Sequence, residues 1–407
     1  MDIIRLFINI VEIIFYVYFG LATIYILIFS FFGLFYRNRK DIKAQKQRKF
    51  AVLIPGYKED AVIVNVAEQA TKQDYPKEKF EVIVIADSFS ETTLENLRNL
   101  PIRVEVVEFE VSKKSKALNL CMNRIGDDYD VAMILDADNI MKADVLTKMN
   151  MAFERGFVAV QGHRTAKNMN ANFAILDAMS EEINNHIFRK GHRVLGLSSA
   201  LIGSGMALDY KLFKSTMATV DSVGEDKEVE LKIIKNRVKI EYIHNAIIFD
   251  EKTSKSDVFV NQRRRWIAAQ LDYFKSHFFD GVWQLITKAN IDYFDKVIQM
   301  VMPPRIILAG ILFILTAISI TFNILSINWI SKLFVSDWQL WTSLFIITAF
   351  SLTISIPRKF YNKKTFVALL SIPHGFILMI ISLLKIKGAS KKFLHTTHGH
   401  TEESKHN

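Results

Sequence analysis

The sequence contains a single cysteine, Cys121, among 407 residues. One cysteine excludes an intramolecular disulfide and a metal site built from several thiolates, and it fits a reducing compartment. Acidic residues are the minority charge, with 42 Asp and Glu against 52 Lys and Arg. The resulting net charge of +10 is compatible with nucleic acid, a membrane surface or an anionic substrate as partner. The length allows one large domain or two modest ones.

Long apolar runs are absent from the middle of the chain, between about residues 50 and 300, but they flank it on both sides. One charge-free run covers residues 13–36, and three more follow late in the chain, at 306–331, 338–357 and 365–384. A helix of about 20 apolar residues crosses a bilayer. The pattern therefore predicts a membrane protein with a soluble domain between its spans.

The first run is predicted to be an anchor rather than a cleaved signal peptide, because its apolar core is too long and no small-residue cleavage site follows it. The next segment, residues 37–49, carries seven basic residues and one acidic residue. By the positive-inside rule this segment places the N-terminus outside and the large domain in the cytoplasm. We therefore expect a multi-pass protein of the inner membrane with its soluble domain on the cytoplasmic side.

The late runs leave the number of spans open at three or four. Residues 332–337 are nearly neutral, as an outside loop would be, whereas residues 358–364 are basic and are expected inside. A further full span would carry the basic segment 385–392 outside, against the positive-inside rule. Because Pro373, His374 and Gly375 lie near the centre of the last run, a broken helix or a re-entrant hairpin is the alternative.

Between the flanking runs, short apolar stretches alternate with segments of helical character. Residues 49–60 are predicted to form a buried strand that ends at Pro55, and residues 80–90 a strand that ends at Asp87, with a helix between them. The same pattern places strands at 104–109, 131–138 and 157–164. We expect an α/β domain with a mainly parallel sheet, in which ligands bind at the carboxyl ends of strands.

The segment from residue 257 to residue 302 mixes aromatic and charged side chains at roughly helical spacing. It is too charged to cross a membrane and too aromatic for an ordinary solvated face. Amphipathic helices that lie at the membrane surface are the preferred interpretation. Core helices of the soluble domain are the alternative.

Asp136 and Asp138 follow a predicted buried strand and leave the sheet together. Two neighbouring carboxylates repel each other unless a cation joins them. A hard divalent ion such as Mg²⁺ binds one or two carboxylates together with substrate phosphates. A metal site is thus predicted at this strand end, and an ordinary surface turn is the alternative.

Glu225 and Asp226 form an acidic pair in a predicted loop. Such a carboxylate can accept a proton from an attacking hydroxyl as a general base. The alternative is a helix-terminal role, because a helical pattern follows and acidic residues stabilise helix N-termini.

The segment 261–270, NQRRRWIAAQ, runs three arginines directly into a tryptophan. Arginine matches phosphate oxygens and keeps its charge, and a tryptophan face stacks against a sugar ring or a base. The alternative is a juxtamembrane basic cluster with an interfacial tryptophan. That alternative does not explain why the cluster lies some 40 residues before the next apolar run.

In this order the groups resemble a membrane-integrated glycosyltransferase of family 2, the family of cellulose, chitin and hyaluronan synthases. The resemblance covers about residues 50–266. The D-x-D motif of that family matches Asp136 and Asp138, its E-D base motif matches Glu225 and Asp226, and its Q-x-x-R-W motif matches Gln262 to Trp266. Asp87 matches the aspartate of that family that contacts the nucleoside, and Lys116, within KSKALN, matches the basic residue that contacts the nucleotide. Gly203 and Ser204 match the residues that line the acceptor path.

The resemblance implies a GT-A type domain and an inverting reaction. A nucleotide-sugar donor, such as a UDP-sugar, would place its uracil at Asp87. Asp138, with Asp136 beside it, would bind Mg²⁺ or Mn²⁺ at the diphosphate, and Asp226 would deprotonate the acceptor hydroxyl. Arg265 would stabilise the departing diphosphate. Gln262 and Trp266 would contact the acceptor sugar, while Arg263 and Arg264 would face lipid or phosphate.

The tail offers a weaker resemblance to the cellulose synthase gating loop, in which Phe393, Thr396 and Gly399 agree with the F-x-V-T-x-K-G pattern. A disordered, His-rich tail is the equal alternative. The resulting domain plan has an anchor at 1–36, a basic linker at 37–49, the GT-A domain at 50–255, the Q-x-x-R-W segment with interfacial helices at 256–304, C-terminal membrane helices at 305–385 and a tail at 386–407.

Three functions remain open at this point. The first is processive synthesis of a surface polysaccharide, with an oligomer or an export partner completing the path. The second is transfer of one sugar to a lipid-linked acceptor, which the small number of spans favours. The third is an inactive membrane adaptor, against which the intact motif set argues. Nucleic acid is not expected as a partner, because the basic residues cluster beside the spans.

Overall fold

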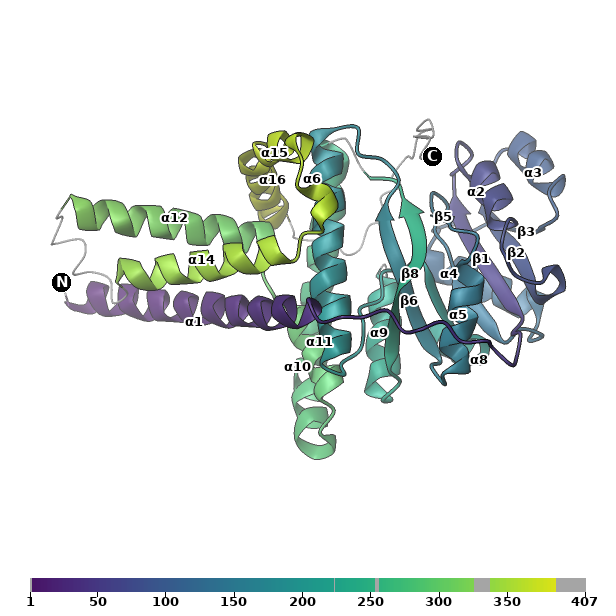
Figure 1. Cartoon of the computed structure of the whole chain (residues 1–407), viewed down its shortest axis with the longest axis horizontal. Coiled ribbons are helices and arrows are strands. Elements are labelled where there is room, and N and C mark those ends of the chain that lie inside the picture. Colours follow the sequence, from purple (N-terminus) through teal and green to yellow (C-terminus); the bar gives the residue numbers. More distant parts are fainter. Residues whose placement is uncertain (1, 223, 253–255, 326–336, 386–407) are drawn as a thin grey trace.

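The structure is a computed structural model of the chain, and it describes residues 2–222, 224–252, 256–325 and 337–385. Three parts follow one another along its longest axis (Figure 1). A bundle of three helices, α1 (Asp2–Gly33), α12 (Arg305–Ile324) and α14 (Trp338–Ile354), forms one end. A sheet domain forms the other end. Crosswise helices, among them α6 (Asn172–Asn184) and α10 (Ser256–Lys288), lie between these two parts.

The described residues form one sheet of eight strands, in the order β3-β2-β1-β4-β7-β6-β8-β5. Strands β1, β2, β3 and β4 pair in parallel, as do β6 and β8, whereas β7 and β5 pair antiparallel to their neighbours. The predicted α/β domain with a mainly parallel sheet is thus confirmed. The strand bounds are β1 (Phe50–Tyr57), β2 (Phe80–Asp87), β3 (Arg103–Val107), β4 (Val131–Ile134), β5 (Ile140–Met141), β6 (Ala159–Ala166), β7 (Met206–Asp209) and β8 (Ile240–Asp250).

Helices cover both faces of this sheet, which explains why its strands read as continuous apolar runs. The predicted helix between the first two strands is α2 (Ile63–Ala70), and β1 continues past the predicted end at Pro55 to Tyr57. The remaining helices of the domain are α3 (Glu91–Arg98), α4 (Lys114–Ile125), α5 (Val145–Glu154), α8 (Tyr210–Met217) and α9 (Glu225–Lys235), with the short elements η1 (Lys77–Lys79), η2 (Asn185–Gly191) and α7 (His192–Val194).

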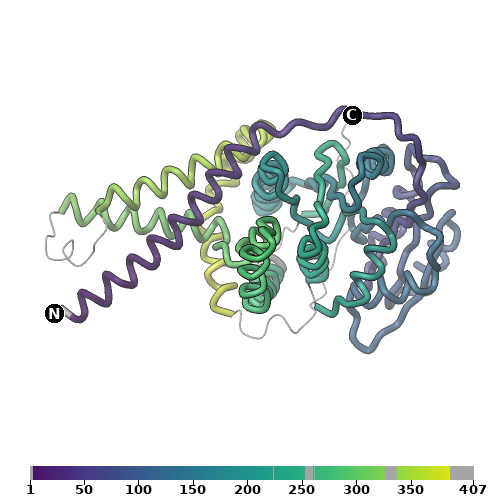
Figure 2. Tube along the Cα trace, turned by 90° about the horizontal axis from the view of Figure 1, so that it is seen from below, coloured from purple at the N-terminus to yellow at the C-terminus, as the bar shows by residue number. Residues whose placement is uncertain are grey.

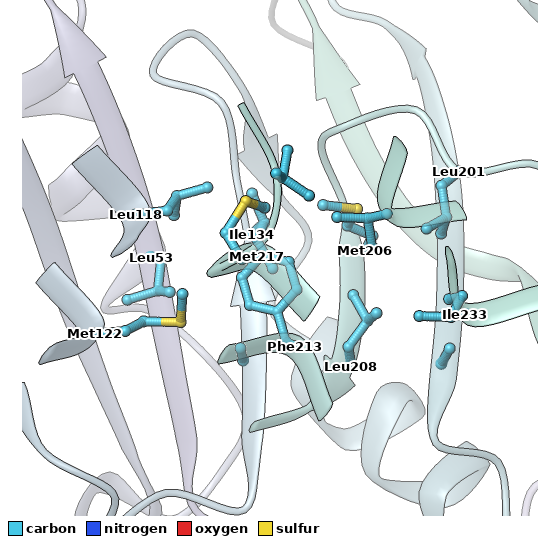
Figure 3. Packing of buried hydrophobic residues seen from close by; sticks show 14 of the residues in the cluster. Leu53, Leu118, Met122, Ile134, Leu201, Met206, Leu208, Phe213, Met217 and Ile233 are labelled. Carbon is cyan, nitrogen blue, oxygen red and sulfur yellow. The ribbon is translucent and has the colours of Figure 1, made fainter. Parts of the chain in front are cut away.

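One core lies between the sheet and helices α4, α8 and α9 (Figure 3). In Figure 3, Leu53 and Ile134 project from the strands toward Leu118 of α4 and Phe213 of α8. All four side chains are fully buried. Burial of each such side chain stabilises the folded state by about 1.5–3 kcal/mol relative to leaving it exposed to water. This packing fixes α4 and α9 over the strand ends where the predicted site residues lie.

Two helices in the described part of the chain, Ile3–Gly33 and Arg305–Ile324, are long and apolar enough to cross a membrane. Helix α14, with 17 residues, lies beside them and hydrogen-bonds α1 through the buried pair Thr23 and Thr348, whose hydroxyls are 2.9 Å apart. The last predicted run is a bent pair, α15 (Lys363–Leu369) and α16 (Ile372–Leu384), with an angle of 46° between the helices. The break lies between Leu369 and Ile372, before the Pro373 to Gly375 segment, and both predicted alternatives, a broken span and a re-entrant segment, stay open. The pair is preceded by η3 (Arg358–Phe360).

Helices α10 and α11 (Ile291–Gln299) occupy the segment predicted to be amphipathic. Figure 2 shows α10 nearly end-on while the bundle extends sideways, so α10 runs across the bundle axis. Tyr293 and Val297 of α11 belong to the core of the sheet domain, whereas Phe279, Trp283 and Ile286 of α10 are exposed. The alternative of core helices therefore holds for the buried part of α11, and the membrane-surface interpretation stays a prediction for α10. The predicted tail motif and most of the loop at 332–337 lie outside the described residues.

Candidate active site

Predicted site residues lie at the carboxyl ends of β2 and β4, the two strands that flank β1 in the sheet. Asp87 ends β2 and is buried, and its carboxylate accepts a hydrogen bond from the Ser88 hydroxyl at 2.9 Å. Lys58 and Ser88, which follow β1 and β2, both have positive φ values near 60°. Such backbone conformations cost about 1–3 kcal/mol and concentrate at functional sites. Two of the four non-glycine residues with positive φ in the described part of the chain thus lie at this sheet edge.

The D-x-D segment forms a turn after β4 that is held by hydrogen bonds. The Asp136 backbone amide donates to Ser204 Oγ at 2.9 Å, and the Ser204 hydroxyl donates to Asn139 Oδ1 at 2.6 Å. Asn139 Nδ2 in turn donates to Asp138 Oδ1 at 2.8 Å and to Asp250 at 2.9 Å. Ser204 is fully buried, so its hydroxyl supports this turn, and its predicted acceptor contact stays a prediction.

Lys114, at the start of α4, lies in the centre of the site. Its ammonium donates to Asp136 Oδ1 at 2.5 Å and to the Gly203 carbonyl at 2.8 Å, and it lies 3.4 Å from Glu225 Oε1. Burial would lower the pKa of Lys114, but the surrounding carboxylates, Asp136 first, outweigh burial and raise it. This lysine joins the D-x-D turn to the E-D pair.

The sequence motif favours Lys116, whereas the structure places Lys114 at the centre of the site. Lys116 is exposed, and its ammonium donates to the Val111 carbonyl at 3.4 Å. Both lysines occur in the same basic run, but Lys114 is the first residue of α4, and this end of the helix faces the carboxyl ends of the strands. The two lysines differ in their position within the helix, and the sequence motif alone does not show where the helix begins.

Gly203 approaches the site closely. It has a φ of +76°, and a Cβ atom at this position would lie 3.5 Å from Lys114 Nζ and 3.6 Å from Asp226 Cβ. A positive φ favours glycine, because a side chain there is strained. The 203–205 turn thereby places the Gly203 carbonyl within reach of the central lysine.

Glu225 and Asp226 form the first turn of α9, after Gly224 as its N-cap. Neither side chain caps the helix, although acidic residues here also favour the helix dipole. Burial raises the pKa of Asp226, Glu230 adds to the rise, and Lys227 and Lys114 oppose it. Burial likewise raises the pKa of Glu225. A half-buried carboxylate with a raised pKa is suited to act as a general base.

The Q-x-x-R-W segment lies on α10. Burial lowers the pKa of Arg265, and the nearby Glu225 carboxylate opposes this change. Trp266 is 39% exposed, and the Arg263 guanidinium lies 4.7 Å from its ring centre. Arg263 also pairs with Asp177 of α6 at 2.6 Å, so the expectation that it faces lipid or phosphate is corrected. Gln262 is half-buried on the same helix.

In the described part of the chain, no group of three or more His, Cys, Asp or Glu side chains could hold a metal ion by itself. Mg²⁺ commonly binds only one or two carboxylates, and phosphates and water complete its shell. Asp136 and Asp138 fit this type of site because both follow β4, and the Asp136 side chain is 31% exposed. These residues suit an ion that is shared with a phosphorylated ligand.

Comparison with known proteins identifies the family of the chain. A family described as "Glycosyltransferase like family 2" matches residues 47–269. The beta-monoglucosyldiacylglycerol synthase of Trichormus variabilis is 23% identical over 246 residues, which is 58% of this chain and 51% of that protein. TarS of Staphylococcus aureus, a poly(ribitol-phosphate) beta-N-acetylglucosaminyltransferase, is 28% identical over 102 residues, 24% of this chain and 18% of that protein. The chain spans about half the length of the first of these relatives.

A solved structure shares the fold. The mannosyltransferase PcManGT of Pyrobaculum calidifontis, in complex with GDP-Man and Mn²⁺, matches with a TM-score of 0.52 at 14% identity. The match covers 87% of this chain and 97% of that chain. At this identity the similarity concerns the GT-A type fold alone.

Proposed function

Because the chain belongs to glycosyltransferase family 2, we propose that it transfers a sugar, with inversion, from a UDP-sugar donor to an acceptor at the membrane surface. One observation carries the proposal. Lys114 contacts both the Asp136 carboxylate and Glu225, beside the half-buried Asp226. The D-x-D turn and the candidate base are thus adjacent.

The proposed reaction assigns a role to each of these groups. Asp226 accepts the proton of the acceptor hydroxyl. At the same time, the oxygen of that hydroxyl forms a bond to the anomeric carbon of the donor. The bond from that carbon to the diphosphate oxygen breaks on the opposite side, which inverts the configuration. Lys114 and Arg265 stabilise the charge on the leaving diphosphate. Asp138 and Asp136 would hold Mg²⁺ or Mn²⁺, whose charge further neutralises that diphosphate.

The remaining predicted contacts belong to the two substrates. Asp87, buried at the end of β2, would bind the uracil, and Lys116 stays a predicted nucleotide contact at the rim. Trp266 and Gln262 on α10 would contact the acceptor, with Gly203 on the opposite side. The stack of Arg263 on Trp266 would hold the indole ring in place for this contact.

Among acceptors, a membrane lipid that receives one sugar is favoured over a growing polysaccharide. The bundle interior is filled by apolar side chains such as Phe19, Leu312 and Trp341, and α1 contacts α14 directly through Thr23 and Thr348. Such packing favours an acceptor that approaches along the membrane surface. A polysaccharide acceptor remains the second candidate, supported by the Q-x-x-R-W segment beside the site, and it would require an oligomer or an export partner.

The proposal places the sheet domain on the cytoplasmic side of the inner membrane in a multi-pass chain. The basic segment 37–49 lies between α1 and the sheet domain, where the positive-inside rule expects it. Nucleotide-sugars would then reach the site from the cytoplasm.

The test is UDP release by purified protein in lipid, with Mg²⁺ or Mn²⁺, over a panel of UDP-sugars. We expect metal-dependent release with one donor, and at least about a thousandfold loss in Asp226→Asn with UDP binding retained. Glu228→Gln is the matched control, because Glu228 lies on α9 but pairs with Lys232 at 2.7 Å. Turnover retained in Asp226→Asn would remove this residue as the base. Product size then separates a single transfer from a polymer.

A further inference from the structure

Helix α11 carries three buried charged side chains within two turns, Asp292, Asp295 and Lys296, with exposures of 6%, 8% and 0%. Each faces a different part of the molecule. Asp292 accepts from the Ser198 amide at 2.7 Å and from its hydroxyl at 2.6 Å. Asp295 accepts from the Tyr25 hydroxyl of α1 at 2.7 Å. Lys296 points to the remaining neighbour, α9.

The only ion partner that the structure gives Lys296 within the described residues is Glu230 of α9, whose Oε1 lies 3.8 Å from Lys296 Nζ. That ammonium is buried and makes no hydrogen bond in the described part of the chain. A buried charge without hydrogen bonds is costly, and a buried ion pair is often no more stable than an apolar pair of the same shape. Stability alone therefore gives a weak reason for a lysine at this position.

Glu230 connects α9 to the loop beside the active site. It is 1% exposed and accepts from the Leu201 amide at 3.0 Å and from Lys227 Nζ at 2.9 Å. Lys227 also donates to the Leu201 carbonyl, at 2.7 Å. Two residues later, the Gly203 carbonyl accepts from Lys114. Glu230 thus fixes the loop that contacts the central lysine, and it lies one helical turn after Asp226.

We propose that the Lys296–Glu230 pair positions the Asp226 carboxylate, so that α11 sets the geometry of the candidate base from outside the substrate site. The inference rests on the proposed function. Lys296 holds Glu230 from α11, Glu230 holds the 198–205 loop, and α9 carries both Glu230 and Asp226. Asp292 fixes the start of the same loop at Ser198. One helix thereby places both the base and the loop opposite it.

The charges that face Asp226 make this role measurable. Burial raises its pKa, Lys227 and Lys114 lower it, and the Glu230 carboxylate raises it. Removal of the Glu230 charge therefore lowers the pKa of Asp226. Removal of the Lys296 charge leaves Glu230 unopposed from α11 and has the contrary effect. Glu225 and Tyr273 also face Asp226, Arg189 faces Glu230, and Asp295 faces Lys296, and these groups are unchanged in both variants.

The experiment compares Glu230→Gln, Lys296→Met and the double variant as purified proteins in lipid. UDP release is measured against pH, and UDP affinity is measured separately. We expect kcat to fall about tenfold or more in each single variant, while the Kd for UDP changes less than about threefold. The acid limb of the kcat profile should move to lower pH in Glu230→Gln and to higher pH in Lys296→Met. Lys235→Met is the control, because Lys235 is a surface residue of α9 that pairs with Asp280 at 2.8 Å.

The proposal would be overturned if the acid limb of the kcat profile did not move in the two single variants, or moved in the same direction in both. A pair with a merely structural role would lower kcat without moving the acid limb in opposite directions. If Lys296→Met does not fold, Glu230→Gln and the double variant decide. A double variant with wild-type kcat and an unmoved limb overturns the role of the pair. Absence of UDP release by the wild-type chain with every donor would instead refute the proposed function, and the inference with it.

Discussion

Two lysines in the same short basic run have different environments. Lys114 contacts Asp136, Gly203 and Glu225, whereas Lys116 is exposed. We expect Lys114→Met to lower kcat/KM at least about a hundredfold, or roughly 3 kcal/mol, because it removes the cation beside the leaving group. Lys116→Met, which removes only a predicted nucleotide contact at the exposed rim, is the comparison and should lower kcat/KM less than about tenfold. The measurement is kcat/KM for UDP release at saturating metal, in each variant and in the wild type. Equal losses in both variants would contradict the central position of Lys114.

Individual site residues also show which parts of the candidate site the sequence could predict and which it could not. Asp136, Glu225 and Asp226 were selected from their place after strands and before a helix, and the structure brings them together around Lys114. Ser204 and Arg263 are predicted by motif alone. The contact of Arg263 differs from expectation, whereas the acceptor contact of Ser204 stays a prediction. Ser204 supports the Asp136 turn, and Arg263 pairs with Asp177 of a helix 86 positions away in the sequence. Contacts between distant elements are not encoded in a local motif.

At the scale of elements, α10 has both a site function and an exposed apolar stripe. Phe279, Trp283 and Ile286 recur at helical spacing and are 81%, 63% and 74% exposed. Because α10 crosses the bundle axis at the end nearest the sheet domain (Figures 1 and 2), we infer that the stripe inserts into the lipid surface. Amphipathic spacing predicted such a helix. It could not predict that α11 instead buries Tyr293 and Val297 in the sheet-domain core.

The stripe can be tested with an environment-sensitive dye. Trp283→Cys carrying the dye should show blue-shifted emission in lipid nanodiscs, because its side chain would lie in the acyl region. Glu95→Cys on α3, an exposed residue of the sheet domain, is the control and should report water. Cys121 is buried, and burial raises the pKa of its thiol to about 12, so it should not label. Emission at position 283 equal to that of the control would exclude lipid insertion.

At the scale of the whole molecule, the path of α16 decides how many times the chain crosses the membrane. Met379 of α16 packs against Ile267 of α10 and Ile307 at the start of α12. One turn later, the Ser382 hydroxyl lies 3.4 Å from the Val260 carbonyl, also on α10. Helix α16 therefore runs along the crosswise α10 rather than along the length of α12. We expect the bent pair to stay on the side of the sheet domain.

Accessibility of introduced cysteines to a membrane-impermeant maleimide tests this arrangement. Asp337→Cys, at the start of α14, should label in intact cells, because α12 would carry it across the membrane. Arg358→Cys, at the end of α14, should label only after permeabilisation. Lys385→Cys distinguishes three crossings from four, since it follows α16 directly. Protection of Lys385→Cys in intact cells means that α15 and α16 do not cross, and this agrees with the basic character of residues 385–392. Labelling in intact cells would make the bent pair a fourth span and would place the C-terminal tail opposite the site.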